Sequence, residues 1–307
     1  MYASTVRGLL VRGMLAGLIA GLFAFAVAYV VGEPPVRGSI AVEEATAAKE
    51  AAPAAGHAGH GGAEAAPAAG EEEELVSRPV QSTVGLATGV LVYGVALGGI
   101  ASLAFSFVLG RVGGFSPRAT AALTAAGAFT TVYFVPFLKY PASPPAVGNP
   151  DTIGQRTTLF FLMILLSVLL GVGAVILGRR LAPRLGNWNA TLAAGGGFVV
   201  ATALAFLVLP DNTDAVKPEF PAALLWEFRV ASVTVQVVMW VVFGIVFGVL
   251  AQRLLAQPRV FSPQSGLTHS RSAGMASRPV RSRPTASSVP GTRGEWMSQT
   301  PGPASRG

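Results

Sequence analysis

The chain has 307 residues, of which 51% are hydrophobic and only 12% are charged. This composition excludes an ordinary soluble protein and predicts an all-α, polytopic membrane protein. The absence of cysteine excludes disulfides and thiolate metal sites, so a bound metal would need histidine, carboxylate, amide or carbonyl ligands. The net charge of +7 does not indicate nucleic-acid binding, because eight of the 22 basic residues follow position 252.

About six segments are apolar over a length that crosses a hydrocarbon core of roughly 30 Å at about 1.5 Å per residue. They are residues 8–31, 83–109, 119–138, 157–178, 188–209 and 230–251. The first segment begins like a signal peptide, but its apolar part is longer than the usual length of about 7 to 15 residues, so we expect a retained helix.

These segments predict four parts of the chain. They are a first transmembrane helix in residues 1–31, an acidic, histidine-containing extracytoplasmic loop in 32–78, a five-helix transmembrane domain in 79–256, and a disordered, basic cytoplasmic tail in 257–307.

The basic residues predict the orientation of the helices. With six crossings, 15 basic residues lie on the side of the N-terminus and seven on the other side. Since cytoplasmic loops are rich in Lys and Arg, both termini are expected in the cytoplasm. The short loops that carry this prediction contain Arg111, Arg118, Arg179, Arg180 and Arg184. Of the 15 acidic residues, 14 fall on the opposite side, and acidic residues contribute little to orientation, so their distribution needs another explanation.

The first outer loop has two parts. Residues 36–50 have the composition of a short amphipathic helix at the membrane surface, and this helix contains Glu43 and Glu44. The following residues are rich in Ala, Gly, Pro and Glu and include His57 and His60. Imidazole and carboxylate groups together favour loose capture of a divalent transition metal. The alternative is a low-complexity linker with two incidental histidines.

Residues 135–156 join the third and fourth apolar segments and contain five prolines. Prolines at both ends stop helices, so this central turn is expected to be rigid and polar, at a membrane surface. Within it, Asp151 offers oxygen ligands or, alternatively, caps the helix that begins near Thr152.

Other motifs limit the function further. The sequence has no G-x4-G-K-[ST] phosphate-binding loop and no H-E-x-x-H zinc motif, so we expect no enzyme. Ionisable residues are absent from the middle of the apolar segments, which disfavours a proton relay and leaves an uncharged polar path that includes Gln236. Glycines at spacings of four in residues 13–21 and 94–98 predict close helix packing.

The central turn resembles the CbtA family of predicted cobalt transporter subunits. The similar residues are Val135-Pro136-Phe137-Leu138-Lys139-Tyr140-Pro141, followed by 144–148 and 151–154, and shorter stretches at 7–21, 43–45, 187–190 and 225–229. The similarity covers about residues 5–255. It implies a permease for cobalt uptake that serves cobalamin biosynthesis, working with a small single-span, histidine-bearing subunit similar to CbtB.

We therefore expect a multi-pass protein of the cell (inner) membrane that takes up divalent cobalt, with nickel as the alternative ion. Cobalt(II) would be the transported ion, not a permanently bound cofactor. The expected metal ligands at the outer face are Glu43, Glu44, His57, His60 and Asp151. Two other hypotheses are a non-transporting membrane scaffold or regulatory subunit of another permease, and an uptake system for an organic anion facing Lys139, Arg156 and Arg229.

Overall fold

A computed structural model describes residues 3–51, 77–145, 147–148, 150–211, 216 and 220–256. The described residues contain helices and no strands, which confirms the all-α prediction. They belong to one compact unit, Met1–Pro258. His57, His60 and the predicted tail from residue 257 lie outside the described residues.

The helices follow one another with short interruptions. The first continuous helix consists of α1 (Ala3–Val27), the π-helical segment η1 (Ala28–Gly32) and α2 (Glu33–Ala51). The second consists of α3 (Arg78–Val80), π-helical η2 (Gln81–Gly85) and α4 (Leu86–Val108). The third consists of α5 (Pro117–Ala128), π-helical η3 (Phe129–Phe134) and α6 (Val135–Lys139). A 3₁₀ turn, η4 (Pro150–Thr152), precedes α7 (Ile153–Val208), and α8 (Ala222–Ala256) is the last described helix.

Five of these helices are long and apolar enough to cross a membrane, which confirms a polytopic membrane protein. They are Ser4–Lys49, Arg78–Val108, Pro117–Lys139, Ile153–Val208 and Ala222–Ala256. The predicted helix in residues 36–50 is present as α2, but it continues the first membrane helix without a break.

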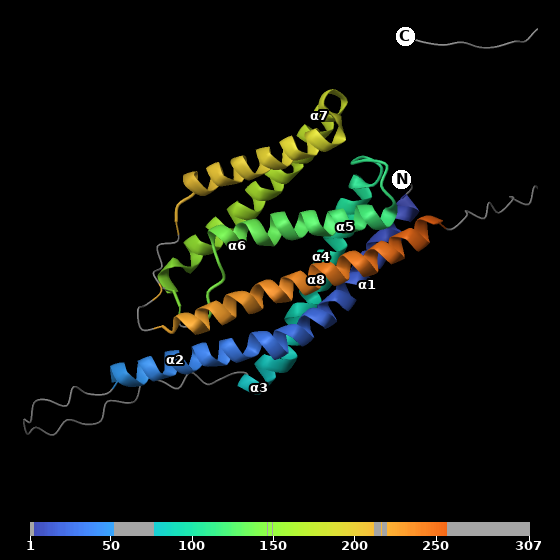
Figure 1. The fold of residues 1–307 in the computed structure, drawn as a ribbon. Helices are drawn as coiled ribbons and strands as arrows, with labels where there is room; N and C mark the ends of the chain where they lie inside the picture. Colours follow the sequence, from blue (N-terminus) through green and yellow to red (C-terminus); the bar gives the residue numbers. More distant parts are fainter. Residues whose placement is uncertain are drawn as a thin grey trace, which may run out of the picture. The chain divides into compact units, whose positions relative to one another are not determined.

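Helix α7 is bent back on itself at Gly186. A straight helix of 56 residues would extend about 84 Å, far beyond a hydrocarbon core. Gly186 has φ 75° and ψ 162°, a conformation that glycine adopts without steric cost. The two arms touch beside the bend, since a Cβ atom on Gly178 would lie 3.2 Å from Cβ of Ala194. Figure 1 shows the two arms, and the predicted segments 157–178 and 188–209 fall on one arm each.

The core forms where α1 packs along α4 and α8, and α5 packs along α8. Small residues of α1, including Ala16 and Ala20, lie fully buried, while Phe105 of α4 packs edge-on against Phe247 of α8 with ring centroids 5.0 Å apart.

The contact between α1 and α4 confirms the prediction from the glycine spacing. A Cβ atom on Gly94 would lie 2.5 Å from the carbonyl oxygen of Gly17, and one on Gly98 would overlap the carbonyl oxygen of Gly13. Only glycine therefore allows these two backbones to approach so closely.

The prediction that Pro136 stops the third helix is wrong. The helix continues through Pro136 to Lys139. Proline lacks the N–H that an α-helix would donate to the carbonyl four residues earlier. The preceding turn is π-helical, so that Val135 N–H bonds to the carbonyl of Thr130, five residues back. The wider turn accommodates the proline, and the irregular part of the central turn begins only at Tyr140.

Candidate functional site

The predicted outer residues lie at one end of the described unit. Figure 1 shows α2, the connection from α6 to α7 and the beginning of α8 at this end. The hydroxyl of Ser39, which is fully buried in α2, donates a hydrogen bond to the carbonyl of Pro145 in the central turn. A Cβ atom on Gly38 would lie 2.9 Å from Cδ1 of Leu224, near the start of α8. Helix α2 is therefore attached to the protein and does not rest on a membrane surface alone.

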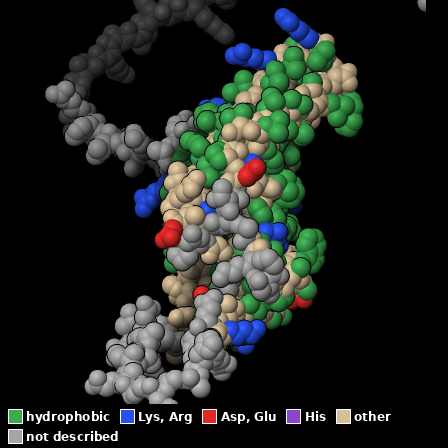
Figure 2. Space-filling model, turned by 90° about the vertical axis from the view of Figure 1, so that its left-hand side faces the viewer, with side chains coloured by type: hydrophobic (Ala, Val, Ile, Leu, Met, Phe, Trp, Pro, Cys, Tyr) green, Lys and Arg blue, Asp and Glu red, His purple; other side chains and the backbone are tan. Residues whose placement is uncertain are grey.

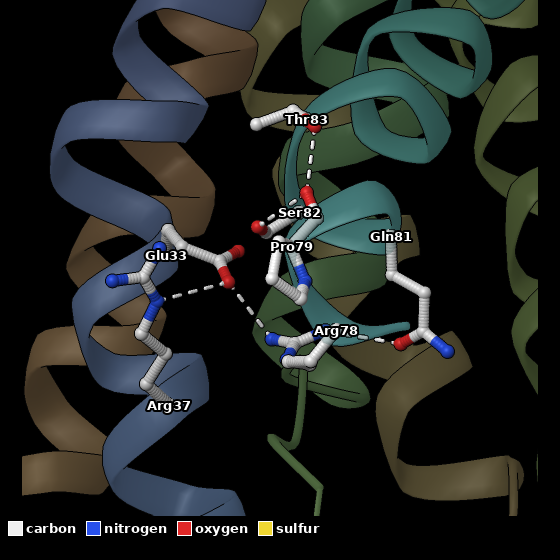
Figure 3. A network of polar contacts seen from close by, with 7 residues as sticks. All are labelled: Glu33, Arg37, Arg78, Pro79, Gln81, Ser82 and Thr83. Atoms are coloured by element: carbon white, nitrogen blue, oxygen red, sulfur yellow. Dashed lines mark hydrogen bonds and ion pairs between the residues drawn. The ribbon is translucent and has the colours of Figure 1, made fainter. Parts of the chain in front are cut away.

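A buried carboxylate joins the first membrane helix to the second. Glu33, at the start of α2, is only 6% exposed. Its Oε1 accepts hydrogen bonds from Arg37 Nε at 3.3 Å and Arg78 Nη2 at 2.9 Å. Figure 3 shows the carboxylate between the two guanidinium groups, and Arg78 Nη1 also donates to Gln81 Oε1 at 3.3 Å. The carboxylate thus connects the two ends of the outer loop in residues 32–78.

Glu33 is one of the acidic residues predicted on the outer side, but the sequence predicts no role for it. The available indication was its position directly after a long apolar segment, where a charge needs a partner. Its partner Arg78 is 45 residues away, and only the structure brings the two together.

The central turn is bound to the end of α7 by Lys139 and Tyr140. The ammonium of Lys139 donates to the carbonyl of Phe206 at 2.8 Å and to the carboxylate of Asp211. The last carbonyls of a helix lack backbone donors, and Pro210 has no N–H to supply one to Phe206. A cation at this position is also favoured by the helix dipole. Lys139 therefore takes the place of the missing backbone donor.

Tyr140 adds a second bond to the same region. Its hydroxyl donates to the carbonyl of Pro210 at 2.7 Å. Burial raises the pKa of the Tyr140 phenol above its ordinary value, which already leaves the hydroxyl protonated and able to donate at neutral pH. The central turn, which carries the most specific residues of the resemblance, therefore connects the ends of two helices in this structure.

A cavity of about 490 Å³ lies beside the central turn. Its walls are mainly apolar, and its polar side chains include Ser143, Arg156 and Thr157. None of the described residues that line it is acidic. At the same turn, Arg229 Nε donates to the carbonyl of Ala142 at 3.4 Å. Two of the three basic residues considered for an anionic substrate, Lys139 and Arg229, therefore bind backbone carbonyls.

The predicted metal ligands do not converge in the described part of the chain. Glu43 and Glu44 are exposed on α2, and Asp151 is exposed in η4. The N-cap of α7 falls on Thr152, one residue after Asp151. Among the described residues, no three His, Asp or Glu side chains lie together in a group able to hold a metal ion. Figure 2 shows acidic side chains scattered over the face that it draws. The ligand roles, including those of His57 and His60, remain predictions.

The opposite end of the unit is basic. A cavity of about 840 Å³ lies between the α4–α5 loop and the bend of α7. Arg111 and Arg179 are among its lining residues, together with Asn187 and Thr191, and no acidic residue is among the described residues that line it. In the sequence, no acidic residue occurs between Glu74 and Asp151. Among the described residues, acidic side chains therefore occur only at the end with α2, whereas basic side chains occur at both ends.

Comparison with known proteins identifies a family for the chain. A family model described as a probable cobalt transporter subunit, CbtA, matches residues 6–252. The match includes the central turn, α2 and all but the ends of the five long helices. No curated protein and no solved structure matches the chain.

Proposed function

The chain belongs to the CbtA family of probable cobalt transporter subunits, and on this premise we propose that it is the permease component that carries divalent cobalt into the cell. The observation that supports this proposal best is the division of charge. Of 15 acidic residues, 14 lie in the segments that the orientation assigns to the outside, whereas the cavity at the other end contains Arg111 and Arg179. Such a division raises the cation concentration at one face of the protein only.

In the proposed topology the chain crosses the inner membrane six times, and both termini lie in the cytoplasm. The two arms of α7 count separately because they are joined by the bend at Gly186. This topology places the α4–α5 loop and the bend of α7, with their five arginines, on the cytoplasmic side.

Capture of the ion is proposed to take place on α2 and the loop that follows it. Glu43 and Glu44 lie about one turn beyond Ser39, which holds α2 to the central turn. His57 and His60 follow in the same loop, and Asp151 belongs to the neighbouring turn. Exposed ligands bind loosely, and mixed nitrogen and oxygen ligands suit cobalt, with nickel as the competing ion.

The family description, a transporter subunit, indicates that a partner is needed. We assign this role to a small single-span, histidine-bearing protein of the CbtB kind. The imported cobalt would then supply cobalamin biosynthesis.

The proposal is tested by uptake of radioactive cobalt into cells that express the chain with and without the small partner. The double variant Glu43→Gln/Glu44→Gln, the double variant His57→Ala/His60→Ala and Asp151→Asn should each raise the apparent KM. We expect a several-fold rise for the glutamate pair, corresponding to about 1 kcal/mol of lost attraction for the cation. Nickel added as competitor measures selectivity.

The matched control is Lys49→Gln, because Lys49 is exposed on the same helix and carries the opposite charge. This variant should leave the apparent KM unchanged or lower it. Absence of uptake above background in every combination would contradict the permease function and favour a membrane scaffold.

A further inference from the structure

Polar side chains meet inside the membrane helices, at a distance from the exposed carboxylates. They are Tyr133 of η3, Gln236 and Trp240 of α8, and beside them Tyr93 of α4, which is 40% exposed. The hydroxyl of Tyr133, Oε1 of Gln236 and Nε1 of Trp240 are buried and have no hydrogen-bond partner among the described residues. Tyr93 interacts with the side chain of Gln236, and its phenol lies close enough to Tyr133 for an electrostatic interaction.

Such atoms are costly in a membrane protein. A buried polar group without a partner loses its hydration, at a cost of about 1–3 kcal/mol, and lipid provides no replacement. Three such atoms lie on two packed elements and do not serve stability, since apolar side chains of the same shape would avoid the cost. A polar occupant at this position would account for them.

Tyr133 and Gln236 lie at a similar depth. Tyr133 precedes Lys139 by six residues, and Gln236 follows Arg229 by seven, which corresponds to about 9 Å and about 10 Å of helix. Lys139 belongs to the central turn and Arg229 donates a hydrogen bond to it, both at the predicted outer border. Tyr133 and Gln236 therefore lie inside the hydrocarbon layer, about two turns below that border, and Trp240 lies about one turn deeper than Gln236.

Two residues of the cluster line cavities. Tyr133 is part of the wall of the 490 Å³ cavity beside the central turn. Trp240 is part of the wall of a cavity of about 10 Å³ at the close contact of Gly17, Gly94 and Gly98. The smaller volume is about what one water molecule needs. The cluster thus borders both a wide cavity beside the central turn and the tightly packed contact of α1 with α4.

The backbone beside the cluster is also unusual. Tyr133 belongs to the π-helical segment Phe129–Phe134, in which the hydrogen-bond ladder is shifted by one residue. One carbonyl of this segment, that of Thr131, accepts a hydrogen bond from the buried hydroxyl of Ser167. π-helical turns occur frequently at functional sites, and loosened carbonyls at membrane depth are tolerated where they face a cavity.

We propose that Tyr93, Tyr133 and Gln236 form a neutral oxygen site at which the transported divalent cation, with part of its hydration water, crosses the outer half of the membrane. This inference rests on the proposed function. The hydroxyl and amide oxygens face the ion, and the indole N–H of Trp240 donates to one of its waters. Neutral oxygens bind a late transition metal weakly, so the ion is not trapped, as conduction requires.

The first test compares uptake kinetics of Tyr133→Phe and Gln236→Leu with wild type. Each variant should lower the maximal rate by on the order of tenfold, the effect of one lost ligand to a charged group, while the apparent KM set by the outer carboxylates stays the same. Thermal stability of Tyr133→Phe in detergent should be equal or higher, because an unpaired polar atom is removed. An unchanged maximal rate in both variants overturns the proposal.

Matched controls lie on the same helix. The hydroxyls of Ser232 and Thr234 donate to the carbonyls of Phe228 and Val230, four residues earlier, and are not needed by an ion. Ser232→Ala and Thr234→Val should therefore transport at the wild-type rate.

A second test does not depend on transport. The natural chain contains no cysteine, so a single Gln236→Cys variant can be treated with a small, water-soluble thiol reagent. Cysteine at 236 should react with reagent that enters from the side of the central turn. Ile245→Cys should not react, because residue 245 lies outside the cluster on the membrane helix α8, where its 63% exposed surface faces lipid and not water. If residue 236 is unreactive while wild type takes up cobalt, the intramembrane site is wrong and the permease function stands. If residue 236 reacts but wild type takes up no cobalt, the hydrated cluster stands and the cobalt function is wrong.

Discussion

Burial separates charged residues that hold the helices together from those that are free to meet an ion. The side chain of Glu33 is 7% exposed and its carboxylate lies between two guanidinium groups, and the side chain of Lys139 is 9% exposed and its ammonium bonds to a helix end. Asp211, the partner of Lys139, is 89% exposed, so its ion pair contributes little. Glu43 and Glu44, in contrast, are exposed on α2. Their exposure suits the proposed role of collecting a cation from solution.

The contact of Glu33 with Arg78 gives a prediction for stability. Arg78→Gln should destabilise the protein by up to about 3 kcal/mol, because it leaves a buried carboxylate with only the more exposed Arg37 as partner. Glu33→Gln should cost less, since the side chain of Arg78 is 35% exposed and turns to water. The measurement is thermal unfolding in detergent.

The double variant Glu33→Gln/Arg78→Gln completes a double-mutant cycle for this ion pair. It should be more stable than Arg78→Gln alone, because the unpaired buried charge is gone. Additive losses would show that the ion pair does not couple the two helices. Lys49→Gln, on the exposed part of α2, is the control and should not change stability.

At the scale of the elements, the contact between α1 and α4 and the π-helical segments determine how the membrane helices fit. Two helices whose backbones touch at Gly17 and Gly94 leave room for no other side chain. Each of the three long N-terminal helices contains one π-helical segment. In the third, this segment accommodates Pro136 and carries Tyr133.

Glycine substitutions test the contact between α1 and α4. Gly98→Ala should destabilise the protein by about 1–3 kcal/mol, because the added methyl group would overlap the carbonyl of Gly13. Gly89→Ala lies on the same helix, where a Cβ atom meets nothing within 4 Å, and should be neutral or stabilising. Thermal unfolding of both variants in one detergent is the measurement. Equal stability of the two variants would contradict the tight contact.

At the scale of the whole molecule, the function depends on which end faces the outside. A cation gathered by carboxylates at the end with α2 would leave past the arginines at the other end, so the charge division gives transport a direction only in the proposed orientation. The reverse orientation would place the acidic loop in the cytoplasm.

Labelling of single cysteines tests the orientation. Ala48→Cys on α2 should react with an impermeant maleimide in intact cells, and Gly114→Cys in the α4–α5 loop should react only after permeabilisation. Both positions are exposed, so access to reagent, not burial, decides the result. The opposite pattern of labelling would remove the electrostatic basis of the proposed function.

The sequence by itself determined the class of the protein, the positions of its apolar helices and the glycine runs at which helices pack closely. These features are local, because hydropathy over about 20 residues and glycines at spacings of four are both properties of one helix. The same locality explains the error at Pro136, where the rule for a proline in an α-helix did not include a π-helical turn.

The tertiary structure alone decided which polar residues meet. Glu33 and Arg78 are 45 residues apart, and Lys139 and Asp211 are 72 apart. The cluster of Tyr93, Tyr133 and Gln236 combines three helices, so the sequence showed only separate polar residues in apolar segments. Partners of this kind depend on how helices cross and rotate against one another, which no pattern along one helix specifies.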